Sequence, residues 1–288
     1  MRNLMAQLLS REITLPLIAV FETLALPRAT YYRHQAHPVA ADPDMELRDQ
    51  IQRLALEWPQ YGYRRITAQL HRQGVEVNHK RVLRLRREDN LLCLRKRRII
   101  RTTDSSHAFA VYPNLVPELT LSAINQLWVA DITYIRLLRE FVYLAVILDA
   151  YSRRCIGWAL EPYLEAALAL EALRMALATR EVEPGLVHHS DRGVQYAASA
   201  YTDLLKERGM RISMSRRGNP YDNAQAERFM KTLKYEEVYL FEYETLAEAR
   251  ARIGHFLEEV YNQKRLHSAL GYVPPAEYEQ QLCQTTDA

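Results

Sequence analysis

The chain has 288 residues, 48% of them hydrophobic, and a net charge of +3, so it holds enough apolar sequence for the core of one large domain or two. Its cysteines, Cys93, Cys155 and Cys283, form no Cys-x-x-Cys pair, which excludes a disulfide framework and gives no zinc signature. No apolar run approaches the roughly 20 residues of a membrane span and no export signal opens the chain, so we expect a protein of the reducing cytosol with no membrane partner.

The net charge averages two unlike parts of the chain. Residues 1–110 hold 19 Lys and Arg against 11 Asp and Glu, a net charge of +8, and residues 111–288 hold 19 against 24, a net charge of −5. The excess is densest in 61–101, where 13 basic residues meet 3 acids. This asymmetry indicates a polyanion as the partner of the first part. The acid surplus of the second part suits a metal-dependent catalytic domain.

The first part of the chain predicts helices. Residues 1–43 are predicted to form short helices and an Ala- and Pro-rich linker, and apolar residues at helical spacing predict a helix over 44–57. Two more helices are predicted over 63–72 and 79–91, with Gln73-Gly74 as the stop signal between them. Two short helices joined by a Gly-containing turn are the pattern of a helix-turn-helix.

The second of these helices carries basic residues that we expect to contact DNA, namely Lys80, Arg81, Arg84, Arg86 and Arg87. In a helix-turn-helix such side chains bind phosphates, and the early residues of the second helix reach base edges. The alternative is a small helical linker domain whose charges are merely solvated. DNA contact is the better interpretation because the basic run continues to Arg101. We therefore predict a DNA-binding region over 44–101 and an extended linker over 102–124.

The composition of 125–280 predicts a different kind of domain. Strands are predicted at Gln126–Leu137, Glu140–Asp149, Arg154–Leu160, Leu186–His189 and Arg211–Met214, and helices at Glu165–Arg180, Ser199–Arg208 and Thr245–Lys264. Three strands followed by alternating helices and strands predict an α/β domain with a mixed sheet flanked by helices. Residues 281–288 are expected to be a tail.

Three acids in this domain are candidates for chemistry. Asp131 lies within a strand, where an Asp side chain needs polar surroundings, and Asp191 opens the loop after the fourth strand. Glu227 opens a helical segment in which Lys231 and Lys234 follow on the same face. Singly, each acid has an ordinary explanation as a buried hydrogen-bonding group, a turn residue or a surface charge. Together, oxygen ligands from separate elements are what a pair of Mg²⁺ ions requires.

For several other polar residues near these acids, a structural role is the first interpretation to consider. Asp149 is a candidate for approaching the metal ions, but capping of the second strand is the better interpretation, and Asp222 is expected to open a capping box at the start of the Glu227 helix. His188 and His189 are candidates for supporting the second acid, and a structural role is the better interpretation of His188.

Three motifs carry a resemblance to a known family: Trp128-x-x-Asp131-x-Thr133-Tyr134, His189-Ser-Asp191-x-Gly193, and Gly218-Asn-Pro-x-Asp-Asn-Ala-x-x-Glu227. They resemble the DDE signatures of bacterial insertion-sequence transposases, in particular the second-frame product of the insertion-sequence-three family, whose core resembles retroviral integrases. Thirty-five residues separate Asp191 from Glu227, the spacing typical of that family. The pattern Tyr261–Pro275 and residues 61–98 also fit, so the resemblance covers roughly residues 20 to 280.

The resemblance implies an RNase H-like catalytic domain in which Asp131, Asp191 and Glu227 are both the catalytic and the metal-binding residues. They would hold two Mg²⁺ or Mn²⁺ ions, and Lys231 and Lys234 would bind DNA phosphate beside them. The implied reaction is cleavage of a DNA strand at the end of the element, followed by attack of the freed 3′-hydroxyl on target DNA.

The family also implies partners. Two DNA ends must be brought together, so we expect a homo-oligomer in a synaptic complex, acting on the bacterial nucleoid. The sequence starts without the DNA-binding and leucine-zipper region that the family's first frame encodes, so we expect an upstream-frame protein or a frameshift fusion to help recognise the ends. Ala130 stands where many relatives have a hydroxyl residue, a departure that removes no ligand.

Two alternatives to a DDE transposase remain open. A non-catalytic DNA-binding regulator or domesticated transposase remnant would use 61–101 and would not cut DNA, although the intact acids argue against it. A nuclease of the RNase H type would share the fold but leaves the helix-turn-helix unexplained.

Overall fold

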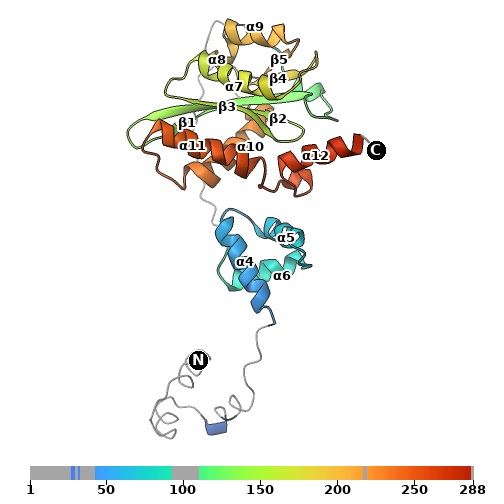
Figure 1. Cartoon of the computed structure of the whole chain (residues 1–288), viewed down its shortest axis with the longest axis vertical. Coiled ribbons are helices and arrows are strands. Elements are labelled where there is room, and N and C mark those ends of the chain that lie inside the picture. Colours follow the sequence, from blue (N-terminus) through green and yellow to red (C-terminus); the bar gives the residue numbers. More distant parts are fainter. Residues whose placement is uncertain (1–26, 30–31, 33–42, 93–109, 217–218, 287–288) are drawn as a thin grey trace. The chain divides into compact units, whose positions relative to one another are not determined.

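The computed structural model describes residues 27–29, 32, 43–92, 110–216 and 219–286. Most of the predicted N-terminal helical segment, and the basic residues from Arg95 to Arg101, lie outside the described residues. The chain divides into two compact units, 1–53 and 54–288, and the division falls inside helix α4 (Met45–Glu57) (Figure 1). The domain boundaries given above stay predictions. None of the helices in the described part is long and apolar enough to cross a membrane.

The second unit begins with a helix pair, α5 (Tyr63–Arg72) and α6 (His79–Glu88). Gly74, with φ +83°, takes the left-handed conformation that follows the end of α5. Asn78 caps α6, because its side chain accepts the Lys80 N–H at 2.8 Å. The two helices bury Ile66, Thr67 and Leu70 of α5 and Val82, Leu85 and Arg86 of α6.

The rest of the second unit is built on a mixed sheet. Its five strands are β1 (Leu127–Arg136), β2 (Phe141–Asp149), β3 (Cys155–Glu161), β4 (Val187–Ser190) and β5 (Arg211–Met214), in the order β3-β2-β1-β4-β5. β1, β2 and β3 pair antiparallel, whereas β4 is parallel to both β1 and β5. The apolar runs of the sequence placed each strand within one or two residues of its observed bounds, which confirms the predicted mixed sheet.

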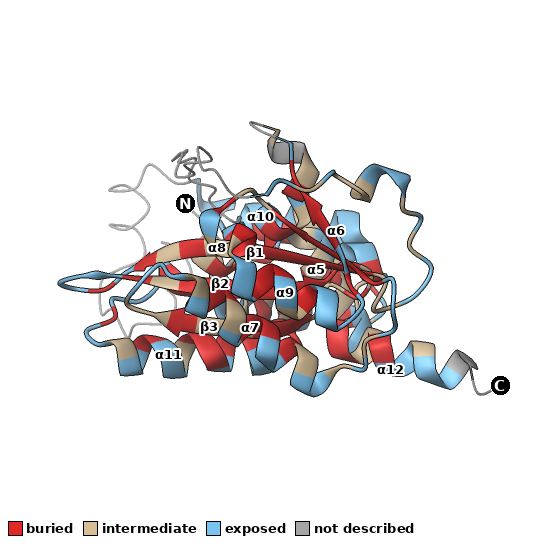
Figure 2. Cartoon of the chain, turned by 90° about the horizontal axis from the view of Figure 1, so that it is seen from above, coloured by how far each residue is buried: buried red, intermediate tan, exposed pale blue. Residues whose placement is uncertain are grey.

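Helices cover both faces of the sheet (Figure 1). On one face lie α7 (Ala166–Thr179), α8 (Val194–Ala197) and α9 (Ser199–Glu207), and on the other α10 (Ala224–Leu233), α11 (Leu246–His255) and α12 (Pro275–Thr286). Alternate residues of β1 serve the two faces: Trp128 and Ala130 join the α7 side, and Leu127 and Val129 the α10 side. The buried residues accordingly concentrate in the sheet and on the inner faces of the helices (Figure 2).

Two helices of the α10 side run on into π-helical turns, Lys234–Val238 after α10 and Phe256–Tyr261 after α11. The predicted helix over Thr245–Lys264 is therefore not one regular α-helix. Short 3-10 turns lie at Val116–Glu118, Pro220–Asn223 and Ser268–Leu270. Helix α12 extends into the predicted tail, because the buried carboxylate of Glu279 holds it to the domain through Arg154 and Arg180, each at 2.6 Å.

Candidate active site

Two of the predicted acids lie just beyond the point where the parallel pairing of β1 with β4 ends. β1 pairs with β4 only as far as Val129, opposite His189, and Asp131 follows two residues later. Asp191 comes directly after Ser190, the last residue of β4. The region outside the carboxyl ends of parallel strands is the usual place for a site in an α/β sheet. The end of the β1–β4 pairing therefore gives both carboxylates room to face a ligand.

The third acid comes from the helix that covers this end of the sheet. Glu227 lies in the first turn of α10, and its side chain is exposed. Its charge acts on Asp131, as does the charge of Asp191. The structure thus brings together Asp131, Asp191 and Glu227 from β1, the β4 loop and α10.

The electrostatics of the site are those of crowded carboxylates. Part of the Asp131 side chain stays accessible, yet the protein surrounds its carboxyl group, and burial is the first cause that raises its pKa to about 8. The Asp191 carboxylate raises this pKa further and Glu227 adds to it, against the Ile132 N–H, which donates to Asp131 at 2.9 Å, and Lys234. Burial also raises the pKa of Glu227. Such repulsion is what a bound cation would relieve.

The three acids fit a divalent metal by the chemistry of their donors. Carboxylate oxygens are the ligands of Mg²⁺ and Mn²⁺, and the charges of Asp191 and Glu227 both add to the effect of burial in raising the pKa of Asp131. As they stand, no three carboxylate, His or Cys groups of the described residues form a ready metal cluster. The arrangement is an open one, in which Glu227 is the exposed member.

Gly193 shapes the loop that carries Asp191. Its N–H donates to the Asp191 Oδ1 at 2.9 Å. A Cβ at position 193 would meet that same oxygen at 2.9 Å and the Gln195 Oε1 at 3.1 Å, closer than carbon and oxygen atoms normally approach. Glycine at this position therefore lets the backbone come close enough to hold the carboxylate.

The two histidines of β4 lie below this loop. The His189 ring bonds the Ser213 hydroxyl at 2.8 Å and the Ser215 hydroxyl at 3.0 Å, and burial lowers its pKa to about 4. A neutral His189 thus links β4 to the end of β5. The His188 ring and the Tyr201 hydroxyl share a hydrogen bond at 2.9 Å within the core on the α7 side, which confirms the structural interpretation of His188.

Of the two lysines predicted to bind DNA phosphate beside the acids, Lys234 acts electrostatically on Asp131. It ends α10 with helical φ and ψ, and its N–H bonds the Met230 carbonyl, so it keeps the helical spacing predicted for Glu227, Lys231 and Lys234; the π-helical turn starts at this residue. Its ammonium group lies 4.7 Å from the centre of the Tyr134 ring, and burial lowers its pKa against the attraction of Asp131. Lys231 is exposed on α10. Tyr134 belongs to the Asp131 motif, but nothing in that motif indicates that its ring supports Lys234.

Arg86 was expected to face DNA, and the structure contradicts this. Its side chain is 2% exposed, because it falls on the buried side of α6 beside Leu85. The guanidinium group donates to the Tyr61 carbonyl at 2.8 Å and to the Leu91 carbonyl at 2.6 and 3.0 Å. The other predicted contacts, Lys80, Arg81, Arg84 and Arg87, are exposed.

Two further predictions have opposite outcomes. Asp149 caps its strand as expected, since its carboxylate accepts the N–H groups of Tyr151 and Ser152, both at 2.9 Å. The capping box at Asp222 is wrong, because Arg216 captures that carboxylate at 3.0 and 3.1 Å and lowers its pKa to about 2. The N-cap residue of α10 is Asn223.

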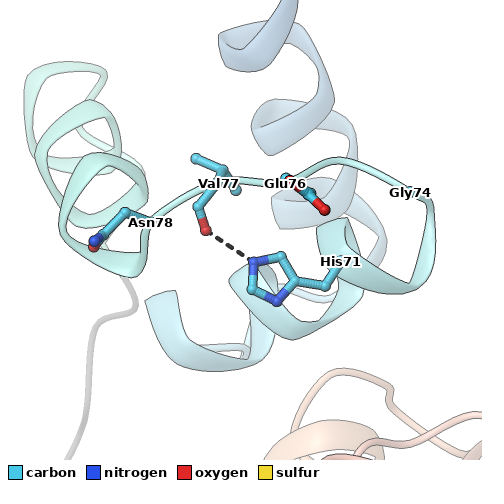
Figure 3. Close-up of a pocket in the computed structure, with 5 residues that line it drawn as sticks. All are labelled: His71, Gly74, Glu76, Val77 and Asn78. Atoms are coloured by element: carbon cyan, nitrogen blue, oxygen red, sulfur yellow. Dashed lines mark hydrogen bonds between the residues drawn. The ribbon is translucent and has the colours of Figure 1, made fainter.

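An open pocket lies away from these acids, over the turn between α5 and α6 (Figure 3). It is lined by His71, Gly74, Glu76, Val77 and Asn78. The His71 ring bonds the Val77 carbonyl at 2.8 Å and so closes the turn. The pocket follows from the shape of the turn and contains none of the three candidate acids.

Known protein families match both parts of the chain. Two families described as Integrase core domain match residues 122–220 and 208–275, and a family described as HTH-like domain matches residues 42–98. The catalytic core of BIV integrase, a crystal structure, is 21% identical and covers 57% of this chain and 99% of its own, with a TM-score of 0.44.

Curated relatives are similar over most of their length. The transposase for insertion sequence element IS904 of Lactococcus lactis is 38% identical over 76% of this chain and 87% of its own. The transposase InsF for insertion sequence IS3A of Escherichia coli is 36% identical over 76% of each chain. The resemblance found in the three acidic motifs is thereby confirmed. The chain belongs to the IS3 family of transposases, enzymes with an integrase core of RNase H-like fold and an HTH-like domain.

Proposed function

We propose that this transposase is a DDE enzyme that cuts a DNA strand at the ends of its element and joins the freed 3′-hydroxyl to target DNA. The observation that supports this most is the convergence of Asp131, Asp191 and Glu227 at the end of the β1–β4 pairing, where the pKa of Asp131 is raised. In this proposal the three acids are both the catalytic and the metal-binding residues.

When bound, two Mg²⁺ or Mn²⁺ ions would lower the pKa of the attacking group, water in the cleavage and the 3′-hydroxyl in the joining, and stabilise the leaving oxygen. The protein's part is to hold the ligands. Asp131 and Asp191 are fixed by the Ile132 and Gly193 N–H groups, each at 2.9 Å, and Glu227 approaches from α10. Transfer takes place directly between hydroxyl and phosphodiester, so no side chain needs to form a covalent bond to DNA.

The basic residues bind the substrate. Lys234, beside Asp131, holds the phosphate that is attacked, and the exposed Lys231 contacts the neighbouring backbone. In the HTH-like domain the exposed residues Lys80, Arg81, Arg84 and Arg87 contact phosphates. Arg86 has no part in this interface, because its guanidinium group is used inside the helix pair.

The proposal includes assembly. Joining two element ends requires at least two catalytic sites, so the protein acts as a homo-oligomer in a synaptic complex on DNA of the bacterial cytoplasm and nucleoid. An upstream-frame DNA-binding protein, separate or fused, helps to select the ends. In this proposal, residues 44–101 bind DNA and residues 125–280 carry out the catalysis.

The experiment uses the full chain with labelled duplex from the terminal repeat of its element, in Mg²⁺ or Mn²⁺. We expect nicking at the element end and joining to target DNA by the wild type. Glu227→Gln should bind the duplex normally but neither nick nor join, whereas Glu207→Gln, at an exposed position of α9, should act as the wild type does.

Other outcomes would overturn the proposal. A wild-type protein that binds the duplex and never cuts it in either metal is a regulator or remnant. A protein that cleaves the RNA strand of RNA–DNA hybrids and joins nothing is a nuclease of the RNase H type.

A further inference from the structure

One edge of β1 is left without a strand where the site begins. The Gln126 carbonyl accepts the Val187 N–H at 3.0 Å, so it points toward β4. Carbonyls two residues apart point to the same side of a strand, and Ala130 therefore also directs its carbonyl toward β4. The pairing with β4 ends at Val129, however. The pairing with β4 therefore ends before the Ala130 carbonyl, which receives no hydrogen bond from that strand.

The side chain of Asn223 takes the place of that strand. Its Nδ2 donates to the Ala130 carbonyl at 3.0 Å, and both residues are buried, Ala130 fully and Asn223 to 6% exposure. Ala130 immediately precedes Asp131, and Asn223 lies one helical turn before Glu227. This hydrogen bond thus joins the two backbone segments that carry Asp131 and Glu227.

The stability of α10 alone does not explain this use of the side chain. Asn223 is the N-cap residue of α10, yet its side chain makes no capping hydrogen bond. Asn is among the preferred N-cap residues because its side-chain oxygen accepts from the first turn of the helix. Here Oδ1 is buried without a hydrogen-bond partner, and the donor is used across the domain. The Asn223 side chain thus contacts β1 and does not make the capping hydrogen bond that would stabilise α10.

We propose that Asn223 is a positioning residue that fixes the first turn of α10 to β1 and so sets Glu227 relative to Asp131. The inference rests on the proposed function, in which these two carboxylates hold divalent ions. Without the amide, the Ala130 carbonyl is unpaired and Glu227 is held less tightly. The defect should appear in metal affinity, and the binding of DNA should stay as it is.

The test compares Asn223→Ala with Asn262→Ala in the full chain. Asn262 is a matched control, because it is equally buried at 6% and its amide bonds the Cys155 N–H and carbonyl, both at 2.9 Å. Two quantities are measured against Mn²⁺ concentration: the rise in melting temperature (Tm) without DNA, and the rate of nicking. Each yields the Mn²⁺ concentration of half-maximal effect.

For Asn223→Ala we expect both half-maximal concentrations to rise about 10- to 100-fold, the usual effect of removing a group that orients a metal ligand. Nicking at saturating Mn²⁺ should fall much less, and Asn223→Gln, which keeps the amide donor, should recover part of the affinity. Asn262→Ala should lower the Tm and leave both concentrations within about twofold of the wild type, since it supports no metal ligand.

The proposal is overturned if Asn223→Ala keeps the wild-type half-maximal Mn²⁺ concentrations, or if Asn262→Ala raises them equally. Asn223→Ser has a hydroxyl too short to replace the amide, so it should share the defect and serves where the Ala variant does not fold. The proposed function fails separately, when the wild type itself never nicks DNA. The Tm measurement still tests the Asn223 contact in that case.

Discussion

The ammonium group of Lys234 lies 4.7 Å from the centre of the Tyr134 ring. Tyr134 follows Asp131 by three residues along β1. Tyr134 is itself held by an edge-to-face contact with Phe141, with ring centres 5.7 Å apart. Burial lowers the pKa of Lys234, and the negative charge of Asp131 opposes that shift. The aromatic ring therefore keeps a partly desolvated cation beside the carboxylates, where a DNA phosphate would meet it.

Replacing Lys234 by Ala should reduce nicking at least tenfold and weaken DNA binding in a salt-dependent way. Loss of one phosphate contact lowers the slope of log affinity against log salt by about 0.9. Tyr134→Leu should lower nicking by about three- to tenfold, in line with a cation–π contact of about 0.5–2 kcal/mol, and Tyr134→Phe should not. Lys206→Ala, at an exposed site on α9, is the control. Equal nicking by Tyr134→Leu and the wild type would contradict the role of the ring.

Gly193→Ala should impair catalysis with little change in stability. The added Cβ would come within 2.9 Å of the Asp191 Oδ1, and the carboxylate can move away at low cost because it is the end of a side chain. We expect nicking to fall at least tenfold while the unfolding free energy changes by less than about 1 kcal/mol.

Gly62→Ala is the matched control for this substitution, since a Cβ there meets nothing within 4 Å. It should leave nicking unchanged. A Gly193→Ala protein as active as the wild type would show that the position of the Asp191 carboxylate is not set by its contact with Gly193.

Arg86→Ala and Arg87→Ala should have different effects although the residues are adjacent. Arg86 donates to the Tyr61 and Leu91 carbonyls from a buried position, so its loss should destabilise the helix pair by about 2–3 kcal/mol. Arg87 is exposed, and its loss should weaken DNA binding without changing stability. Urea denaturation and DNA binding at several salt concentrations measure the two effects. A destabilising Arg87→Ala would contradict the assignment.

His188 should make stability depend on pH. Burial lowers its pKa to about 3, so the folded protein keeps it neutral while the unfolded chain protonates it near the ordinary value of about 6.5. Its contribution is therefore complete above pH 6.5 and is lost as the pH falls toward 3. Below about pH 6.5 the wild type should lose about 1.4 kcal/mol per pH unit more than His188→Gln. Urea denaturation measures the unfolding free energy of both proteins at pH 7.5 and pH 5. The same difference between the wild type and His188→Gln at the two pH values would contradict this.

The strands and the acids could be predicted from the sequence because each depends on a local signal. The run Phe141–Asp149 is apolar on both faces of the sheet, and it is observed as β2. Asp131 lies within a strand and Asp191 directly after one, and Glu227 completes a spacing typical of one family. Their closeness in space follows from the parallel pairing of β1 with β4, a consequence of the fold class.

The remaining features depend on partners that lie outside the residue's own helix or strand. Asp222 has the residue type of a helix cap, but Arg216 competes for its carboxylate with two side-chain hydrogen bonds. Arg86 belongs to a basic run, and only the packing of α5 with α6 reveals that it points inward. The contact of Asn223 with Ala130 spans 93 positions and arises because β4 ends where it does. No local pattern encodes these relationships.

The central claim is that Asp131, Asp191 and Glu227 act as one unit. The direct measurement is single-turnover nicking of an element-end duplex by Asp131→Asn, Asp191→Asn, Glu227→Gln and their double variants. Each single change should reduce nicking by at least about a thousandfold with DNA binding intact, and the double variants should be no slower, because residues that act together are not additive. Asp203→Asn, exposed on α9, should nick at the wild-type rate. A single variant that retains wild-type nicking, or losses that multiply in the doubles, would contradict the account.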